Sequence, residues 1–342
     1  MNERALRSFL LAAASLYSFA CDLDVVVGHA PSSGVIDDGG EPIDNGTPLI
    51  GPRSQLRWLS GSNTGNNVER FLDFEAWRAR PSDLALSFVD RWTGWPGLVN
   101  LAWPVDTLEA VEGRLLLAIP LYPEGEGNNQ DCAAGAYDAQ WRMLGPFLRS
   151  RGRGDSIIRL GWGLNDSAHM WRADPDPTDW VECFRRVANA LRQTGPELEI
   201  AWDFNRQGRA DTSPLDPYSG YPGDEYVDYI GIEGYDMAPP ARTEAEWDEI
   251  CNGPTGLCSV MAFARAHGKR LGLSEWSVVS CQDNGGGDNP FYVDKMFELF
   301  SKNPSVMGFE AYYEDAALCS AIFESDDNPN AAARYRELYA RE

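Results

Sequence analysis

The sequence predicts a (β/α)8 TIM barrel, built as a single domain over residues 54–342. From about residue 54 onward, short apolar or β-branched runs alternate with amphipathic helical stretches. Eight such runs fall within about 290 residues, which is typical of this barrel. The alternative is a doubly wound open sheet. It is disfavoured because no Gly-rich phosphate-binding loop follows the first run.

The predicted elements follow in order from this alternation. The predicted strands span residues 56–60, 84–90, 115–120, 157–162, 199–204, 229–233, 270–275 and 306–311. The clearest predicted helices span residues 131–149, 178–193, 292–301 and 330–341. Pro196, Pro222 and Pro304 fall in the connections, where residues that break helices and strands are expected.

The N-terminal residues predict export. Residues 1–20 have the form of a signal peptide, because Arg4 and Arg7 precede an apolar run that is too short to span a bilayer. Cys21 would then be the first mature residue, the position that bacterial lipoproteins acylate. Ser18 stands where those proteins usually carry Leu, so secretion without a lipid is the alternative. Residues 21–53 are acidic and rich in Gly, Pro and Ser, which predicts a flexible tether.

Composition narrows the class of partner. The formal net charge of −23 disfavours nucleic acid and anionic membrane surfaces, so we expect a neutral ligand. Membrane contact is expected only through the lipid anchor, and the protein is expected to be a monomer. The chain has 12 Trp residues, which serve either core packing or stacking against sugar rings.

The cysteines predict three disulfides. Setting Cys21 aside leaves an even number, which in an exported chain indicates disulfide bonds. We expect the pairs Cys251–Cys258, Cys281–Cys319 and Cys132–Cys183. A zinc site is disfavoured because the chain has only three His and no CxxC pair. No metal or other cofactor is predicted.

Glu275 ends the seventh predicted strand and is followed by Trp276. In a barrel of this type, chemistry gathers at the carboxyl ends of the strands. A carboxylate beside an aromatic ring there is typical of a glycosidase nucleophile. The alternatives are a helix N-cap or a carboxylate paired with an arginine at the rim.

The period of two along a strand indicates which side chains share a face with Glu275. On the sixth strand these are Glu233 and Tyr235, and on the fifth Asp203 and Asn205. On the fourth strand, Arg159 would lie lower in the barrel, where it could neutralise Asp203 and Glu233. We expect these three to form a buried structural network rather than to act directly in chemistry.

Several segments together resemble glycoside hydrolase family 26, the β-mannanase-like members of a clan of retaining (β/α)8 glycosidases. They are residues 158–165 with Trp171, 221–231 with Tyr235 and Asp236, 273–276, and 289–313, and the resemblance spans roughly residues 54–340. It implies that Glu275 is the nucleophile and that Tyr235 orients it by a hydrogen bond. It also implies a Glu acid/base at the end of the fourth strand, where this chain has Gly163.

Glycine has no proton to donate, so the presence of Gly163 leaves two functional predictions open. One expectation is a hydrolase of a neutral, β-linked, mannan-like polysaccharide, either with a substitute acid or restricted to activated glycosides. Asp166 is the nearest substitute in sequence, and Glu310, Glu314 and Asp315 lie near the eighth strand. The alternative is a cell-surface protein that binds the polysaccharide without cleaving it.

Further residues are candidates for contact with the sugar. Asn165 is expected beside the scissile unit, although a helix N-cap is the alternative. His169 either lines the cleft or lies in a surface loop. The remaining candidates are Asn205, the possible stacking platforms Trp162, Trp171, Trp202 and Trp276, and a rim subsite of Trp92, Trp95 and Trp103.

Overall fold

The computed structural model describes residues 47–340, apart from residues 101, 207–214 and 324. The predicted signal peptide, Cys21 and most of the predicted tether lie outside the described residues. The last part of that tether is described, and it packs against the barrel. Arg53 and Ser54 donate their backbone N–H groups to the Asp83 carboxylate at 2.8 and 3.0 Å. Arg53, the last residue of the predicted tether, is therefore held against the start of β2.

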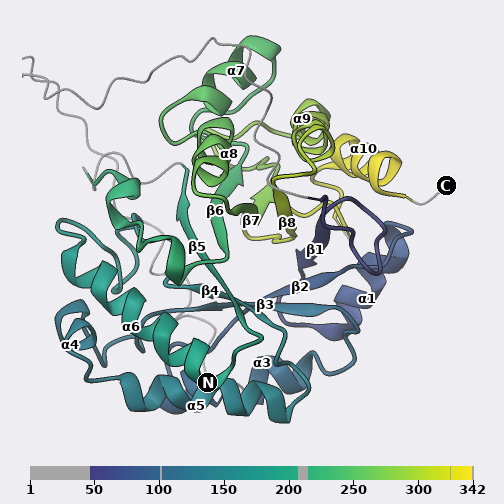
Figure 1. Cartoon of the computed structure of the whole chain (residues 1–342). Coiled ribbons are helices and arrows are strands. Elements are labelled where there is room, and N and C mark those ends of the chain that lie inside the picture. The colour runs from purple at the N-terminus through teal and green to yellow at the C-terminus, as the bar shows by residue number, and fades with distance from the viewer. Residues whose placement is uncertain (1–46, 101, 207–214, 324, 341–342) are drawn as a thin grey trace, which may run out of the picture. The chain divides into compact units, whose positions relative to one another are not determined.

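Eight parallel strands close into a barrel in sequence order, with β1 paired to β8, which confirms the predicted fold class (Figure 1). The strands are β1 (Leu59–Asn63), β2 (Leu84–Phe88), β3 (Arg114–Ile119), β4 (Ile157–Leu160), β5 (Glu199–Asn205), β6 (Tyr229–Tyr235), β7 (Arg270–Ser277) and β8 (Met307–Tyr313). β1 begins three residues later than predicted, because a turn around Gln55, with φ of 62°, precedes it.

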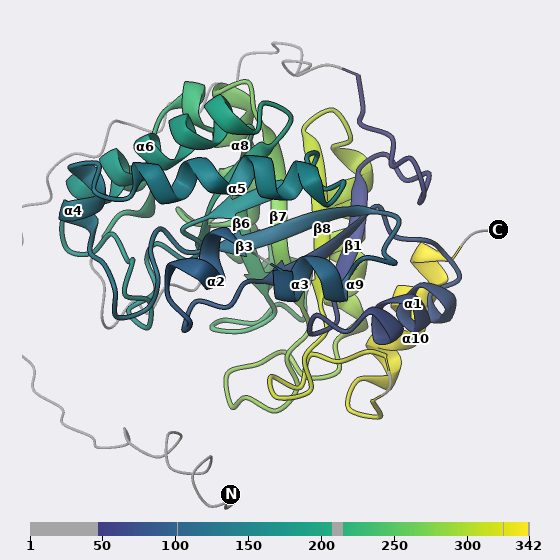
Figure 2. The same ribbon diagram turned by 90° about the horizontal axis from the view of Figure 1, so that it is seen from below.

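Helices surround the strands (Figures 1 and 2). They are α1 (Val68–Trp77), α2 (Trp95–Val99), α3 (Ala102–Thr107), α4 (Asn129–Ala133), α5 (Asp138–Ser150), α6 (Thr178–Thr194), α7 (Glu244–Asn252), α8 (Leu257–Ala266), α9 (Pro290–Lys302) and α10 (Pro329–Tyr339), with short 3-10 turns at Pro217–Gly220 and Asp224–Tyr226. Within the described ranges, no helix combines the length and apolar character needed to cross a membrane.

The helix predicted over residues 131–149 is in fact two helices, α4 and α5. The break falls at Gly135, whose φ of 89° is readily adopted by glycine and rarely by other residues. A Cβ at this position would lie 2.1 Å from the Arg186 guanidinium, which bonds instead to Asp138 at the start of α5. The amphipathic pattern runs through the break, so the pattern alone did not reveal it.

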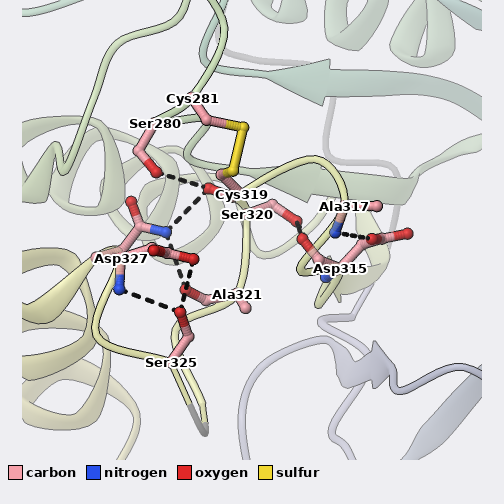
Figure 3. The surroundings of a disulfide bond; sticks show 10 residues. Ser280, Cys281, Asp315, Ala317, Cys319, Ser320, Ala321, Ser325 and Asp327 are labelled. Carbon is pink, nitrogen blue, oxygen red and sulfur yellow. Dashed lines mark hydrogen bonds between the residues drawn. A yellow bond between two sulfur atoms is a disulfide. The ribbon is translucent and has the colours of Figure 1, made fainter. Parts of the chain in front are cut away.

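The three disulfides form with the predicted pairing. Cys132–Cys183 joins α4 to α6, and Cys251–Cys258 joins α7 to α8. Cys281–Cys319 joins the loops that follow β7 and β8, which extend from the same end of the barrel (Figures 2 and 3). The Ser280 hydroxyl and the Asn328 amide both donate to the Cys319 carbonyl oxygen, which fixes this junction. Such bonds are typical of proteins in oxidising compartments.

Candidate active site

Glu275 lies near the carboxyl end of β7, opposite Glu233 of β6 in the strand register. Its side chain is only slightly exposed, with 6% of the residue accessible. Two donors hold the carboxylate: the Arg159 guanidinium donates to Oε1, and the Tyr235 hydroxyl donates to Oε2. Each carboxylate oxygen therefore has a fixed partner, which orients the group at the end of the barrel.

Arg159, at the centre of the barrel, is fully buried and bonds to three carboxylates. It reaches Asp203 at 2.5 Å and Glu233 at 2.6 Å, in addition to Glu275. Although burial lowers the pKa of Arg159, the three carboxylates raise it well above its ordinary value, so the guanidinium stays charged. The predicted buried network of Arg159, Asp203 and Glu233 is present, and it also includes Glu275.

Glu233 is a buried acid next to Glu275. Burial, followed by the charge of Glu275, raises the pKa of Glu233 well above its ordinary value. One guanidinium cannot balance three buried negative charges, and this excess of negative charge favours the protonated form of Glu233. Its second oxygen accepts a hydrogen bond from the Asn205 amide at 2.7 Å, which connects the cluster to β5.

Tyr235 is the last residue of β6, and its hydroxyl contacts Glu275 as the sequence prediction requires. Burial, followed by the charge of Glu275, raises the pKa of Tyr235 well above its ordinary value. The phenol therefore remains protonated and acts as a donor. The ring also lies 5.8 Å from that of Tyr313 at the end of β8, measured between centroids.

Asn165 connects the loop after β4 to β5. Its side-chain amide donates to the Asn205 carbonyl at 2.9 Å, and its side-chain oxygen accepts from the Asn205 N–H at 2.9 Å. This paired contact replaces the N-cap that was the alternative interpretation. Asn165 thus fixes the end of β5, and Asn205 in turn holds Glu233.

Gly163 follows β4 by three residues and has a φ of 61°. A Cβ built there would lie 2.7 Å from Cε1 and 2.9 Å from Nδ1 of His169. Asp166, the nearest carboxylate in sequence, is half-buried, and the same Cβ would lie 3.7 Å from its Cβ. The volume beside Gly163 is therefore occupied by the imidazole of His169.

The proposed substitute acids near β8 differ in their exposure to solvent. Glu310 is fully buried and accepts from the Trp276 indole at 2.6 Å, while Glu314 accepts the backbone N–H groups of Ile322 and Phe323. Neither reaches an open surface, so both are excluded as proton donors to a substrate. Asp315 is half-buried and lines the pocket described below.

All four tryptophans predicted as stacking platforms belong to the buried core, although Trp162, with 4% of the residue accessible, also lines the pocket described below. Trp171, Trp202 and Trp276 are completely buried. Their rings pack against other side chains, such as His169 for Trp171 and Tyr312 for Trp276. A ring that is covered on both faces offers no surface to a sugar, so these predictions were wrong. Composition could not separate core tryptophans from exposed ones.

A pocket of 730 Å³ opens over the carboxyl ends of β1, β2 and β8. Two exposed indoles line it, Trp92 with 67% and Trp103 with 56% of the residue accessible. The complete lining is Asn63, Gly65, Asn66, Phe88, Val89, Asp90, Arg91, Trp92, Trp103, Trp162, Tyr313 and Asp315. Exposed aromatic faces among polar groups are suited to stacking against sugars.

The pocket adjoins the carboxylate cluster through Tyr313, whose ring lies beside Tyr235. Trp162 also lines it, whereas Trp95 packs against Tyr137 and is absent from the lining. The sequence prediction missed a role for Tyr313. The alternation of side chains along a strand could have predicted its position. Residue 313 lies two positions beyond the predicted end of the eighth strand and therefore shares a face with residue 311.

Comparison with solved structures identifies the same barrel in polysaccharide-degrading enzymes. A family 26 endo-β-1,4-mannanase from Cellulomonas fimi aligns with a TM-score of 0.60 over 87% of this chain and 74% of its own, at 14% identity. The catalytic domain of a family 26 endo-β-1,4-mannanase from Bacillus sp. JAMB-750 gives a TM-score of 0.57 over 85% and 88%, at 15% identity. The chain shares its fold with family 26 mannanases. The likeness predicted from sequence is thus confirmed for the fold.

Sequence comparison identifies further relatives, and no family model matches the chain. A β-1,3-xylanase from an Alcaligenes species is 25% identical over 195 residues, which cover 54% of this chain and 38% of the xylanase. Endoglucanase H from Acetivibrio thermocellus is 18% identical over 289 residues, which cover 82% of this chain and 29% of the endoglucanase. The chain therefore matches less than half the length of these relatives.

Proposed function

We propose that this protein is a retaining glycoside hydrolase that acts on a neutral, β-linked, mannan-like polysaccharide. The observation that carries the proposal is the carboxylate of Glu275, held by Arg159 and Tyr235 near the carboxyl end of β7. The barrel shared with solved β-mannanases and the sequence likeness to a xylanase and an endoglucanase support it.

In the proposed mechanism, Glu275 attacks the anomeric carbon and displaces the leaving oxygen, which forms a glycosyl-enzyme ester. Water then attacks the same carbon, releases the sugar and frees the Glu275 carboxylate. Tyr235 keeps the carboxylate from rotating, and Arg159 holds its other oxygen. In the first step, a proton must be donated to the departing oxygen. In the second step, a proton must be removed from the attacking water.

Gly163 stands where that proton donor is expected, and this favours a second candidate function. Without an acid, the barrel would bind the polysaccharide without cleaving it. Asp166 is the substitute that the sequence suggests, and it lies in the loop directly after Gly163. A substrate whose leaving group needs no proton tests Glu275 alone, whereas cleavage of mannan also tests whether a proton donor is present.

The pocket lined by Trp92 and Trp103 is proposed to hold further sugar units of the polymer. Trp162 and Tyr313 extend this surface toward Glu275, and Asn63, Asn66 and Asp90 offer polar groups for the sugar hydroxyls. A neutral glycan suits this acidic chain, because the net charge of −23 disfavours acidic polysaccharides.

The deciding experiment uses a dinitrophenyl β-mannoside, whose phenolate leaves without protonation, with and without azide. We expect release of the phenol, formation of a β-mannosyl azide, and loss of both in Glu275→Ala. Mannan binding without phenol release under either condition would support the binding protein instead. Unchanged turnover in Glu275→Ala would exclude this nucleophile.

We also propose that the protein is exported and held at the cell surface by acylated Cys21, acting as a monomer. The three disulfides support export. Metabolic labelling with a fatty acid should mark the protein and be lost in Cys21→Ser. Unlabelled protein in the medium would favour secretion without a lipid.

A further inference from the structure

The side chain beside Gly163 is the imidazole of His169. A Cβ on residue 163 would lie 2.7 Å from Cε1 of His169, closer than such contacts occur in proteins. A side chain at position 163 and the present placement of His169 therefore exclude each other. The histidine occupies the place from which an acid/base side chain on residue 163 would extend toward the sugar.

The orientation of the ring is fixed from three sides. Nδ1 lies 3.2 Å from the Gly163 carbonyl oxygen, to which it donates as N–H. The ring stacks on Trp171 at 4.6 Å and 14°, and its edge meets Trp162 at 5.6 Å and 70°. Because the carbonyl holds the proton on Nδ1, the nitrogen left for other chemistry is Nε2. Within the described residues, no hydrogen bond engages Nε2.

We propose that His169 is the acid/base of this site, in place of the carboxylic acid absent at position 163. This inference rests on the proposed hydrolase function. In the first step, the imidazolium donates its Nε2 proton to the glycosidic oxygen as the bond to the anomeric carbon breaks and Glu275 forms the ester. In the second, neutral Nε2 takes a proton from water as the water attacks that carbon. The imidazolium is restored and the Glu275 carboxylate is released.

The charges around His169 set the pH at which it acts. Burial lowers the pKa of His169 below its ordinary value of 6.5, and the bond to Gly163 partly offsets this. Asp166 in the same loop raises the pKa, while Arg91 after β2 and Arg159 on β4 lower it. The first step needs the imidazolium, so hydrolysis of the polymer should decline as pH rises through this lowered pKa.

The test compares two substrates in the whole protein. In His169→Ala and His169→Gln, kcat/KM on manno-oligosaccharides should fall by about 10²-fold or more, the usual contribution of general acid catalysis. On the dinitrophenyl mannoside, kcat/KM should fall by less than about tenfold, because that phenolate needs no proton. His267→Ala is the matched control, since His267 bonds to Asp224 in the loop before β6.

Three further measurements complete the test. The decline of oligosaccharide hydrolysis with rising pH should disappear in His169→Gln. Azide should accelerate His169→Ala on the activated substrate and yield β-mannosyl azide. Asp166→Asn should move the decline of oligosaccharide hydrolysis to lower pH, because Asp166 raises the pKa of His169, and hydrolysis should persist below that decline. Because turnover of the activated substrate requires a folded site, it also shows that each variant folds.

The outcomes separate this inference from the proposed function. If the wild-type protein releases phenol but never cleaves oligosaccharides, or if His169→Gln cleaves them at the wild-type rate, His169 is not the acid/base and Glu275 remains the nucleophile. Loss of oligosaccharide hydrolysis at every pH in Asp166→Asn, with His169→Gln unaffected, would assign the role to Asp166. Absence of phenol release from the wild-type protein would overturn the hydrolase proposal and this inference together.

Discussion

Two donors hold the carboxylate of Glu275, one on each oxygen. This arrangement limits the carboxylate to one orientation. One donor, Arg159, is charged, and the other, the Tyr235 hydroxyl, is neutral. Arg159 is buried below the carboxylate and bonds to two further acids, so its removal would disturb the whole cluster. Tyr235 is neutral and donates its hydroxyl to Glu275, and it is the cleaner position for a test.

Replacing Tyr235 with Phe should lower kcat on an activated mannoside with little change in KM. A hydrogen bond to a charged group contributes about 1.5–3 kcal/mol, which corresponds to a reduction of roughly 10- to 150-fold. Steady-state kinetics measure the effect, and the thermal midpoint checks the fold. Tyr221→Phe is the matched control, since Tyr221 bonds to Asp224 away from the cluster. An unchanged kcat would contradict the orienting role.

Gly163 and His169 should respond to mutation as a pair. Gly163→Glu alone should unfold more readily and gain no activity, because its Cβ meets the imidazole and its φ of 61° is costly for a side chain. In Gly163→Glu/His169→Ala the volume is free, and a carboxylic acid can act there. We expect hydrolysis of manno-oligosaccharides by the double variant to exceed that of His169→Ala. If Gly163→Glu hydrolysed manno-oligosaccharides faster than the wild-type protein, a glutamate at position 163 and His169 would fit side by side, which would contradict this prediction.

At the scale of elements, one guanidinium connects four strands. Arg159 of β4 bonds to acids on β5, β6 and β7, and Asn205 adds a second connection between β5 and β6. These bonds lie side by side in the strand register, where Asn205 is opposite Glu233 and Glu233 is opposite Glu275. The position of Glu275 therefore depends on the register of the four strands β4 to β7.

Glu233 should make stability depend on pH. Its pKa is raised by folding, so its contribution to stability is fully present below its ordinary pKa of 4.5 and is lost as pH rises through the folded pKa. Glutamine mimics the protonated form. The thermal midpoint of Glu233→Gln relative to wild type should therefore increase between pH 5 and pH 8. Exposed Glu225→Gln is the control, and equal behaviour of the two variants would contradict the prediction.

The disulfides should contribute unequally to stability. The cysteines of the bond between the β7 and β8 loops are 38 residues apart, and those of the bond between α7 and α8 are 7 apart. On loop-closure entropy alone, the double Ala variants should lose about 4 and about 2 kcal/mol, respectively. Guanidinium unfolding at 25 °C measures both. A larger loss from the shorter link would show that loop-closure entropy does not govern how much each bond stabilises the fold.

At the scale of the whole molecule, the open end of the barrel combines a carboxylate cluster with an aromatic pocket. The pocket begins at Tyr313 beside the cluster and reaches the exposed indoles of Trp92 and Trp103. A substrate that fills both must be longer than one sugar. The pocket should therefore affect long substrates and leave short ones unchanged.

Trp92→Ala and Trp103→Ala should each raise KM for long manno-oligosaccharides by about tenfold, since covering one face of an indole contributes about 1–2 kcal/mol. KM for a mannoside of one sugar should stay the same. Leu72→Ala removes an exposed apolar side chain outside the pocket and serves as the control. Equal effects on both substrates would mean that the pocket does not extend the binding site.

The barrel and the cluster of acids around Arg159 were predictable because they depend on regular geometry. Strand spacing revealed eight parallel strands, and parity placed Asp203, Glu233, Tyr235 and Glu275 on one interior surface. The three cysteine pairs were predictable as well. Proximity in sequence indicated Cys251–Cys258, and neighbouring strand ends indicated Cys281–Cys319. Cys132–Cys183 followed because these two cysteines remained.

The features that the sequence did not reveal depend on tertiary packing. Whether an indole is covered depends on the side chains packed around it, and composition does not give this: Trp202 is buried and Trp92 is exposed. The contact between His169 and Gly163 depends on the turn after β4, whose backbone is left-handed at Gly163. The break at Gly135 likewise depends on a side chain from α6.

The link between Cys281 and Cys319 has a practical consequence for anyone who produces this protein. The two loops that it joins carry residues at the rim of the barrel, and glutathione keeps most cysteines of a bacterial cytosol as free thiols. Material made there, or stored with dithiothreitol, would have both loops untethered. Expression in a periplasm or another oxidising host is therefore the appropriate source for the enzyme assays.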